Sequence, residues 1–248
     1  MNRRSFLTKT AGLGAAFAAC PMATALLKAD EAKSDGRGVV VSTSKITPPA
    51  KGNIPVAILI SEGATVIDFS GPWDAFGSVM IPDRGPAMTD QMPFQLFMVS
   101  DKTDPITVEG GMKVVPDYTF ANVPDCKVVV VPAQKGSKEM QGWLRKMAPT
   151  VDVTMSVCVG VSHLAKAGLL AGKSATIHHD YYDRFAKEHP DIDVRRGVRF
   201  VENEKISTSG GETCGIDLAL RVVERYFGRS VAEKTAFYME YREKGWIV

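Results

Sequence analysis

The chain has 248 residues, of which 45% are hydrophobic, 23% charged and 8% aromatic. This composition excludes a disordered chain, a collagen-like chain and a small disulfide scaffold. The formal net charge is +2, but the first 29 residues contain four bases and no acid, which leaves 26 bases and 28 acids in the remainder. The remainder therefore lacks the basic excess of a nucleic-acid or anionic-membrane binder, and we expect neither partner.

Residues 1–29 predict an export signal. Arg3 and Arg4 stand in the segment NRRSFLTK, a twin-arginine pattern with Phe and Leu at the expected offsets, and a weakly apolar stretch over 11–19 follows. This stretch is about half of the ~20 residues that cross a bilayer, so we expect no stable membrane anchor. The pattern predicts twin-arginine export to the periplasm of a bacterium. An ordinary secretory signal and lipidation at Cys20 remain alternatives.

Residues 30–53 mix Lys, Ser, Thr, Gly and Pro without apolar periodicity, which predicts a flexible, solvated linker. One folded domain is then expected over 54–248. Its expected elements alternate: strands over 56–60, 94–99, 128–131 and 151–157, and helices over 137–147, 161–170 and 216–227. Strands that are apolar on both faces suit a parallel sheet covered by helices on each side.

The ends of the expected helices carry their own signals. Gly168 and Gly172 predict where the helix over 161–170 stops, and Gly228 predicts the end of the helix over 216–227. Ser230 with Glu233 forms a capping-box pattern for a last helix. The alternation of elements predicts an α/β domain with three layers and a doubly wound, mostly parallel sheet.

Three cysteines follow the leader, so at least one thiol stays free or bonds another chain. Cys158 stands between an expected strand and an expected helix, with Ser156 two residues before it and Gly160 two residues after it. This spacing is typical of a strand-to-helix nucleophile elbow, where larger flanking side chains would collide with neighbouring elements.

Such an elbow predicts a nucleophilic cysteine. The sulfur would lie at a helix N-terminus, where amide dipoles lower the pKa of the thiol, and the N–H of Val159 would point toward an oxyanion. The alternative is a buried structural cysteine, since free Cys is often buried. Cys126 and Cys214 lack the elbow pattern, and we expect both to serve packing.

Asp68 is a candidate acid or base, because it follows the first expected strand and the loops after parallel strands share the edge where ligands bind. Its neighbours Ile67 and Phe69 are apolar, so its carboxyl is expected to be desolvated and able to exchange a proton beside a thiol. The alternative is an N-cap for a helix over 71–77.

His178, His179 and Asp180 form a potential metal-ligand group. Adjacent residues on a strand point to opposite faces, so the two histidines are not expected to share an ion, and we predict no metal site and no cofactor. One of these histidines is expected to line the pocket. His163 falls on the helix after Cys158 and is interpreted as a packing or rim residue.

The segments SVCVG over 156–160 and LAKAGLL over 164–170 resemble the nucleophile-elbow region of the ThiJ/PfpI family. The resemblance extends over roughly 54–240 and implies the flavodoxin-like fold of the class I glutamine amidotransferase-like superfamily. The segment IDFSGP over 67–72 is most similar to the isonitrile hydratase branch and to the amidase-like half of some AraC-type regulators. Those regulators carry a helix-turn-helix module after this domain. The sequence ends at Val248, and we expect no such module in it.

In isonitrile hydratases the resemblance implies attack by the cysteine on the isonitrile carbon, to give a thioimidate that water resolves to an N-substituted formamide. Carried over, Cys158 is the nucleophile and Asp68 moves the protons. Two positions depart from that branch. Val159 stands where a catalytic Thr is common, and Ala133-Gln134 replaces a glycine pair, so the oxyanion and pocket residues are expected to be Val159, Ala133, Gln134, Gly160 and His178.

Two kinds of function follow from these patterns. The first is an exported cysteine-dependent hydratase or hydrolase of small carbon–nitrogen compounds, with a small molecule as substrate. The second is a ligand-binding or thiol redox-sensing protein of the same fold, without catalysis. A purely structural role is a third reading, although a strained elbow is seldom kept for packing alone. A homodimer is also expected.

Overall fold

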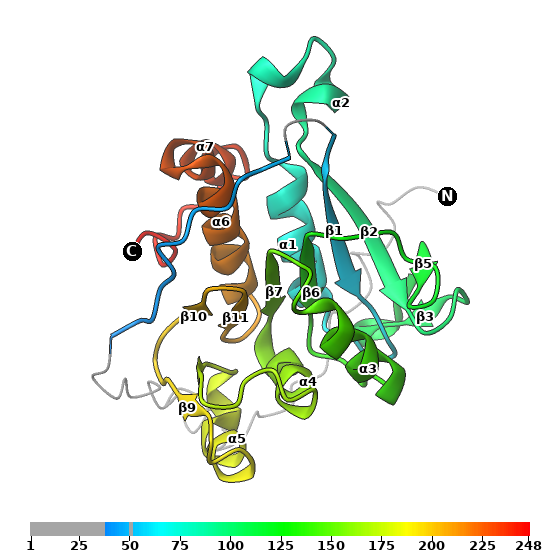
Figure 1. Cartoon of the computed structure of the whole chain (residues 1–248), viewed down its shortest axis with the longest axis vertical. Coiled ribbons are helices and arrows are strands. Elements are labelled where there is room, and N and C mark those ends of the chain that lie inside the picture. Colours follow the sequence, from blue (N-terminus) through cyan, green and yellow to red (C-terminus); the bar gives the residue numbers. More distant parts are fainter. Residues whose placement is uncertain (1–37, 50–51) are drawn as a thin grey trace, which may run out of the picture. The chain divides into compact units, whose positions relative to one another are not determined.

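A seven-stranded sheet forms the centre of the structure, a computed structural model that describes residues 38–49 and 52–248 (Figure 1). The strands, in spatial order, are β10 (Phe200–Asn203), β11 (Ile206–Ser209), β7 (Val153–Ser156), β6 (Val128–Val131), β1 (Ile54–Leu59), β2 (Phe94–Ser100) and β5 (Tyr118–Thr119). All neighbours are parallel except the antiparallel pair β10 and β11. The predicted fold class, a mostly parallel doubly wound sheet, is confirmed.

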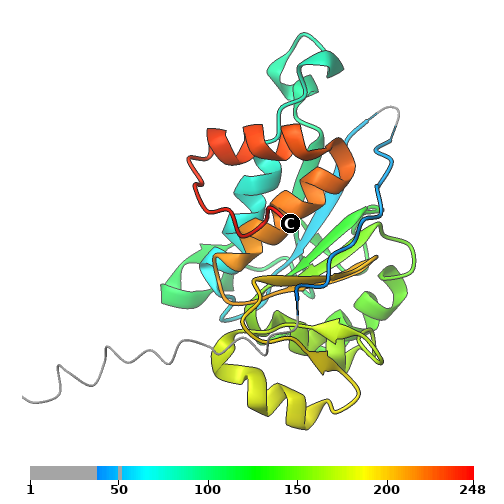
Figure 2. The same cartoon turned by 90° about the vertical axis from the view of Figure 1, so that its left-hand side faces the viewer.

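Helices cover both faces of this sheet (Figures 1 and 2). One face packs against α1 (Val66–Gly77), α6 (Cys214–Phe227) and α7 (Arg229–Tyr238); the other packs against α3 (Lys138–Met147), α4 (Val161–Lys166) and α5 (Tyr182–Glu188). In β1, Val56 and Ile58 belong to the first core, whereas Ala57 and Leu59 belong to the second. Because successive strand residues point to opposite faces, the apolar run fills both cores.

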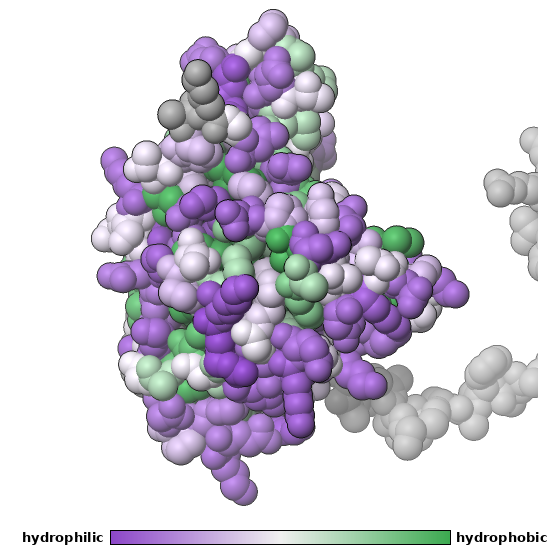
Figure 3. Space-filling model, turned by 45° about the vertical axis from the view of Figure 1, so that its right-hand side comes forward, coloured by the Kyte–Doolittle hydropathy of each residue, from purple (hydrophilic) through white to green (hydrophobic). Residues whose placement is uncertain are grey.

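The remaining elements are short connections between these layers. They are η2 (Pro82–Arg84), α2 (Met88–Gln91), β3 (Ile106–Thr107), η3 (Glu109–Gly111), β4 (Lys113–Val114), η4 (Cys158–Gly160), β8 (Ser174–Ala175), η5 (His179–Tyr181) and β9 (Asp193–Val194). Within the described residues, no helix is both long and apolar enough to cross a membrane. Hydrophilic residues predominate on the face drawn in Figure 3.

The ends of the helices follow the sequence signals with one exception. Gly168 has a φ of 75° just after α4, and Gly228 has a φ of 85° at the end of α6, so both occupy positions that disfavour other residues. Ser137 caps α3 through a bond from the N–H of Met140. The capping box at Ser230 is wrong: α7 begins at Arg229, directly after Gly228, and Ser230 lies inside its first turn.

The segment 38–49 lies against the domain, so the predicted flexible linker over 30–53 is wrong for these residues. The carbonyl of Val40 accepts the N–H of Glu202 at the open edge of β10 (2.8 Å), and the N–H of Ile46 donates to the carbonyl of Arg225 in α6 (2.9 Å). Ser42 is buried. Composition does not show these contacts, because they join parts of the chain far apart in sequence. The twin-arginine segment and Cys20 lie outside the described residues.

Candidate active site

Four loops meet at the carboxyl edge of the sheet. They follow strands that run parallel to one another, β1, β6, β7 and β11, and they cover residues 60–65, 132–137, 157–160 and 210–213. In a doubly wound sheet this edge is where ligands bind. The structure therefore brings Cys158, after β7, to the same edge as Asp68, in the first turn of α1.

Cys158 lies at the predicted strand-to-helix elbow. Its φ of 58° is in the left-handed region, which is unfavourable for a residue with a side chain. The N–H of Val157 donates to the carbonyl of Val131 (3.0 Å), and that of Cys158 donates to the carbonyl of Gly210 (2.8 Å). A Cβ at Gly160 would lie 2.1 Å from the carbonyl oxygen of Val131, so only glycine fits there. The neighbouring strands thus fix the turn on which the cysteine stands.

Asp68 is completely buried, and its contacts exclude the capping role that the sequence left open. It lies inside α1, and its Oδ2 accepts the main-chain N–H of Ala133 at 3.0 Å. Its Oδ1 is buried without a hydrogen-bond partner. The pKa of this carboxyl is raised to about 7. Burial is the main cause, the bond from Ala133 acts against it, and the charges of Glu212 and Glu109 add to it. The carboxyl can therefore both accept and donate a proton near neutral pH.

The Cys158 thiol is also buried, and the predicted lowering of its pKa is wrong. Burial raises the pKa to about 12, and the charge of Asp68 raises it as well. The N–H groups of Val159 and Glu212 bond the sulfur and act in the opposite direction. Their effect is smaller than that of burial, because desolvation of the thiolate dominates. The resting group at neutral pH is the thiol, close enough to Asp68 for the charge of that carboxyl to act on it.

The expected pocket residues divide into those that face the sulfur and those that do not. The N–H of Val159, which was expected to point toward an oxyanion, bonds the sulfur. The N–H of Ala133 is already engaged by Asp68. The Gln134 side chain donates to the carbonyl of Leu59 at 3.4 Å. The N–H of Ala133 is therefore not a free donor to an oxyanion in this arrangement.

Glu212 is a site residue that the sequence analysis missed. It lies in the loop after β11 with a φ of 49°, and its N–H bonds the Cys158 sulfur. The preceding pair Gly210-Gly211 was the only sequence signal, because two adjacent glycines allow a sharp turn there. The turn lies beside Cys158 because β11 pairs with β7, and the glycine pair alone does not show this pairing.

The two histidines near the elbow have different surroundings. His163 is buried in α4, its Nε2 lies 3.0 Å from the carbonyl oxygen of Gln134, and burial lowers its pKa, which supports the predicted packing role. His178 lies against the main chain of Gly211, where an added Cβ would be 2.2 Å from its Cδ2. His178 therefore adjoins the loop that carries Glu212.

Two hollows border this site. Gln134, Val159 and Ile177 contribute to a cavity of about 220 Å³ on the α4 side. Residues around Asp68, together with Glu212, line a hollow of about 290 Å³ on the α1 side. A larger hollow of about 680 Å³ lies elsewhere, between α7 and the C-terminal segment. Neighbours of Cys158 and Asp68 line these two hollows, but Cys158 and Asp68 themselves do not.

The other two cysteines lack this environment. Cys126 is buried in the core beneath α3, and Cys214 is half-buried at the start of α6. Burial raises the pKa of each thiol to about 11. Among the described cysteines none forms a disulfide. The packing role predicted for Cys126 agrees with its contacts, and only Cys158 combines a left-handed backbone with a neighbouring buried carboxyl.

These features define a class of doubly wound α/β proteins with a cysteine on a strand-to-helix elbow beside a buried carboxyl. The chain belongs to the DJ-1/PfpI family, whose sequence profile matches residues 55–225. It is 29% identical over 194 residues to an isonitrile hydratase from Pseudomonas putida, covering 76% of this chain and 78% of the relative. It is 26% identical over 144 residues to the HTH-type transcriptional regulator CdhR from Pseudomonas aeruginosa, but this covers 56% of the chain and only 43% of the regulator.

Solved structures agree with this assignment. A ThiJ/PfpI family protein from Pseudomonas syringae, 28% identical, superposes with a TM-score of 0.66 over 78% of this chain and 77% of the other. Drosophila melanogaster DJ-1beta, 17% identical, has a TM-score of 0.65 over 77% of this chain and 100% of the other, and supports the fold alone. The predicted family is confirmed. Because its members include hydratases and regulators, membership does not define one activity.

Proposed function

We propose that this protein hydrates or hydrolyses small carbon–nitrogen compounds through Cys158 and Asp68, with an isonitrile as the first substrate class. The observation that carries the proposal is a buried thiol on a strained elbow beside a carboxyl whose pKa lies near 7. A proton carrier is most effective when its pKa is close to the working pH. The similarity to an isonitrile hydratase supports the same chemistry.

In the proposed first half-reaction, ionised Asp68 acts as a general base. It takes the proton of the Cys158 thiol while the sulfur attacks the terminal isonitrile carbon, so that the thiolate forms only as it is consumed. Asp68 then gives this proton to the same carbon. The product is a thioimidate with a new carbon–sulfur bond and a carbon–nitrogen double bond, and Asp68 returns to its ionised state.

In the second half-reaction, water adds to the thioimidate carbon. One proton of the water reaches the nitrogen, the carbon–sulfur bond breaks, and the other proton returns to the sulfur through Asp68. The N–H groups of Val159 and Glu212 stabilise the negative charge that develops on the sulfur as this bond breaks. The product is an N-substituted formamide, and the thiol is regenerated.

The test is an assay of the purified protein against isonitriles, amides and glyoxal adducts, with formamide or acid as the product detected. Cys158→Ala should abolish turnover, and Cys214→Ala, which removes the other cysteine at this edge of the sheet, should retain it. Absence of turnover on all three substrate classes, or equal turnover in Cys158→Ala and the wild type, would refute the proposal.

A second candidate function is ligand binding without catalysis. It is favoured by Val159, which has no hydroxyl group, and by the N–H of Ala133, which is engaged by Asp68. The high pKa of Cys158 makes a rapid redox sensor the weaker form of this alternative, because the thiolate is the species that peroxide oxidises. Treatment with mild peroxide followed by intact-mass analysis distinguishes ligand binding from redox sensing. Selective oxidation of Cys158 over Cys126 and Cys214 would support sensing.

A further inference from the structure

His178, His179 and Asp180 gather at the start of η5, where the sequence analysis expected a strand. His178 caps this short helix, and its Nδ1 accepts the N–H of Asp180 at 3.3 Å. The two imidazole rings stack, with centroids 4.4 Å apart and planes inclined by 25°. The two histidines therefore do not point to opposite faces, as they would on the expected strand, because the backbone turns between them instead of extending.

The ligand atoms of these three residues lie close together. One atom from each, two imidazole nitrogens and a carboxylate oxygen, falls within 4.8 Å of the others. One oxygen of Asp180 is 3.1 Å from Nδ1 of His179, and the other is 3.7 Å from Nδ1 of His178. Tetrahedral ligands at 2.0–2.1 Å from a zinc ion are about 3.3 Å apart. Because the ring of His178 is packed against Gly211, the exposed side chains of His179 and Asp180 are the ones that must rotate to bring the three atoms to coordinating distance.

The three side chains differ in how firmly they are placed. The ring of His178 packs on Gly211, with Cδ2 only 2.2 Å from where a Cβ of that residue would be, and its side chain is 21% exposed. The side chains of His179 and Asp180 are 54% and 68% exposed. One ligand is thus held by the fold, while the other two leave a path for an ion to enter from solvent.

We propose that His178, His179 and Asp180 bind one divalent transition-metal ion. Two imidazole nitrogens and one carboxylate oxygen suit Zn²⁺, Ni²⁺ or Cu²⁺, whereas Mg²⁺ and Ca²⁺ prefer an all-oxygen set. With three protein ligands, water completes the coordination, so the ion is exchangeable. This proposal does not rest on the proposed reaction at Cys158, although His178 adjoins the loop that carries Glu212.

The test is a calorimetric titration of the full-length protein, without a histidine tag, with Zn²⁺ at pH 7.5. One ion per chain is expected. Loss of an outer-shell partner alone costs roughly 10–100-fold in metal affinity, so His179→Ala and Asp180→Asn, which each lose a ligand, should weaken binding by at least that factor. Both residues are exposed, and their variants should melt like the wild type without the ion.

Two control variants test whether Zn²⁺ binds at these three residues or at another histidine or cysteine of the chain. His189→Ala removes a histidine at the end of α5, and Cys158→Ala removes the candidate nucleophile; both should bind Zn²⁺ like the wild type. Electron paramagnetic resonance of the Cu²⁺ form should show nitrogen coupling that weakens in His179→Ala. Unchanged Zn²⁺ affinity in both His179→Ala and Asp180→Asn, or its loss in either control, would overturn the proposal.

Discussion

Asp68 and Cys158 are both more difficult to ionise in this fold than in water, and burial is the main reason for each. The carboxyl titrates near 7 and the thiol near 12, so most of the negative charge of the pair resides on Asp68 above neutral pH. This order suits a reaction in which the carboxyl withdraws the thiol proton during attack. It does not suit a preformed thiolate, which the position at a helix N-terminus alone predicted.

Replacing Asp68 tests this division of roles. Asp68→Asn removes the charge that raises the pKa of Cys158, so alkylation by iodoacetamide should become faster at a given pH. Turnover should fall by ~10²–10⁴, the usual cost of losing a proton carrier. Glu109→Gln removes a nearby carboxylate that only influences Asp68 and is the matched control. Full activity in Asp68→Asn would assign the proton transfer elsewhere, with His178 the next residue to examine.

The same variant should change how stability depends on pH. The pKa of Asp68 is raised on folding from 3.8 to about 7, so its folded form binds a proton more tightly than its unfolded form. Its stabilising contribution is present below pH 4 and is lost as the pH rises through about 7. Between pH 5 and 8 the wild type should lose about 3 kcal/mol more unfolding free energy than Asp68→Asn. Urea unfolding of both proteins at pH 5 and pH 8 measures this difference. An equal change of unfolding free energy in the wild type and in Asp68→Asn would contradict the prediction.

The two residues of the proposed reaction could be singled out from the sequence because their signals are local. The small-x-Cys-x-small spacing around Cys158 and the apolar neighbours of Asp68 each lie within a few residues. The position of Glu212 beside the sulfur and the bond from Ala133 to Asp68 depend on which loops meet at the sheet edge. A local sequence pattern does not show which loops these are. The sign of the thiol pKa shift was wrong for the same reason, since burial and the neighbouring charge come from distant segments.

At the level of elements, the elbow between β7 and α4 depends on its close approach to β6. A Cβ at Gly160 would lie 2.1 Å from the carbonyl oxygen of Val131, a main-chain atom that cannot move aside cheaply. Gly160→Ala should therefore destabilise the protein by at least about 1–3 kcal/mol, the usual cost of overpacking. It should also displace Cys158 and lower turnover. Urea unfolding and the isonitrile assay give the two readouts.

A second glycine provides the matched control. Gly142 lies in the middle of α3, where an added Cβ would meet nothing closer than a nitrogen of the Arg145 side chain at 3.9 Å. Gly142→Ala should therefore stabilise the protein by up to about 1 kcal/mol through helix propensity. Equal effects of the two substitutions would show that the approach to Val131 is not what restricts Gly160.

The larger elements were predictable because periodicity alone specifies them. The apolar run of β6 and the helical spacing in α6 gave both type and approximate bounds. The short turn η5 and the ordered segment 38–49 were not predicted, since each is stabilised by residues distant in sequence, Gly211 in one case and Glu202 in the other. Elements of a few residues carry too little pattern to be assigned from sequence.

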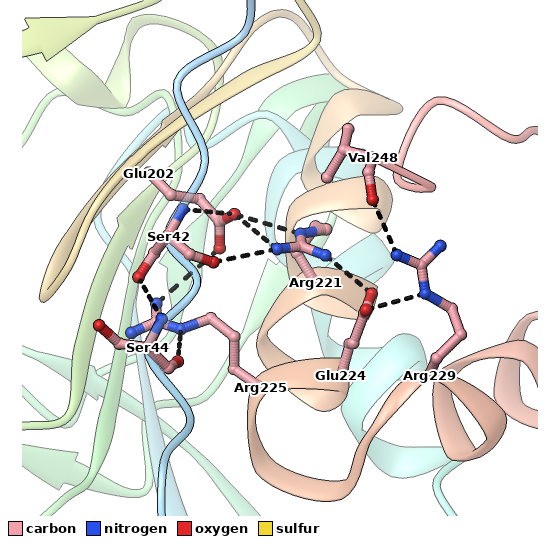
Figure 4. A network of polar contacts seen from close by, with 8 residues as sticks. All are labelled: Ser42, Ser44, Glu202, Arg221, Glu224, Arg225, Arg229 and Val248. Carbon is pink, nitrogen blue, oxygen red and sulfur yellow. Dashed lines mark hydrogen bonds and ion pairs between the residues drawn. The ribbon is translucent and has the colours of Figure 1, made fainter.

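At the scale of the whole molecule, a buried ionic network joins the segment 38–49 to β10 and α6 (Figure 4). Glu202 is completely buried and accepts from Arg221 and from the N–H of Ser42, while Arg221 donates to the carbonyl of Ser42. Arg225 donates to the carbonyl of Ser44. A buried charge cluster is costly when a partner is removed. The segment therefore completes the domain even though it lies outside the region that matches the family profile.

Truncation tests this contribution. Deleting residues 1–49 removes the main-chain partners of Glu202, Arg221 and Arg225, and should lower the unfolding free energy by roughly 1 kcal/mol for each lost hydrogen bond. Deleting residues 1–37 keeps all of these partners and is the matched control. Thermal unfolding of both truncated proteins measures the difference. Equal melting temperatures would show that the segment contributes nothing to stability.

The predicted export signal concerns the molecule as a whole, because the twin-arginine route carries proteins that have already folded. We propose that the domain folds, with its thiols reduced, before it leaves the cytoplasm. Replacing Arg3 and Arg4 by Lys should then leave the precursor inside the cell, whereas a general secretory signal would tolerate the change. Lys28→Gln removes a leader charge outside the arginine pair and should be exported normally. Immunoblots of periplasmic and cytoplasmic fractions distinguish the routes, and normal export of the double-lysine variant would exclude the twin-arginine route.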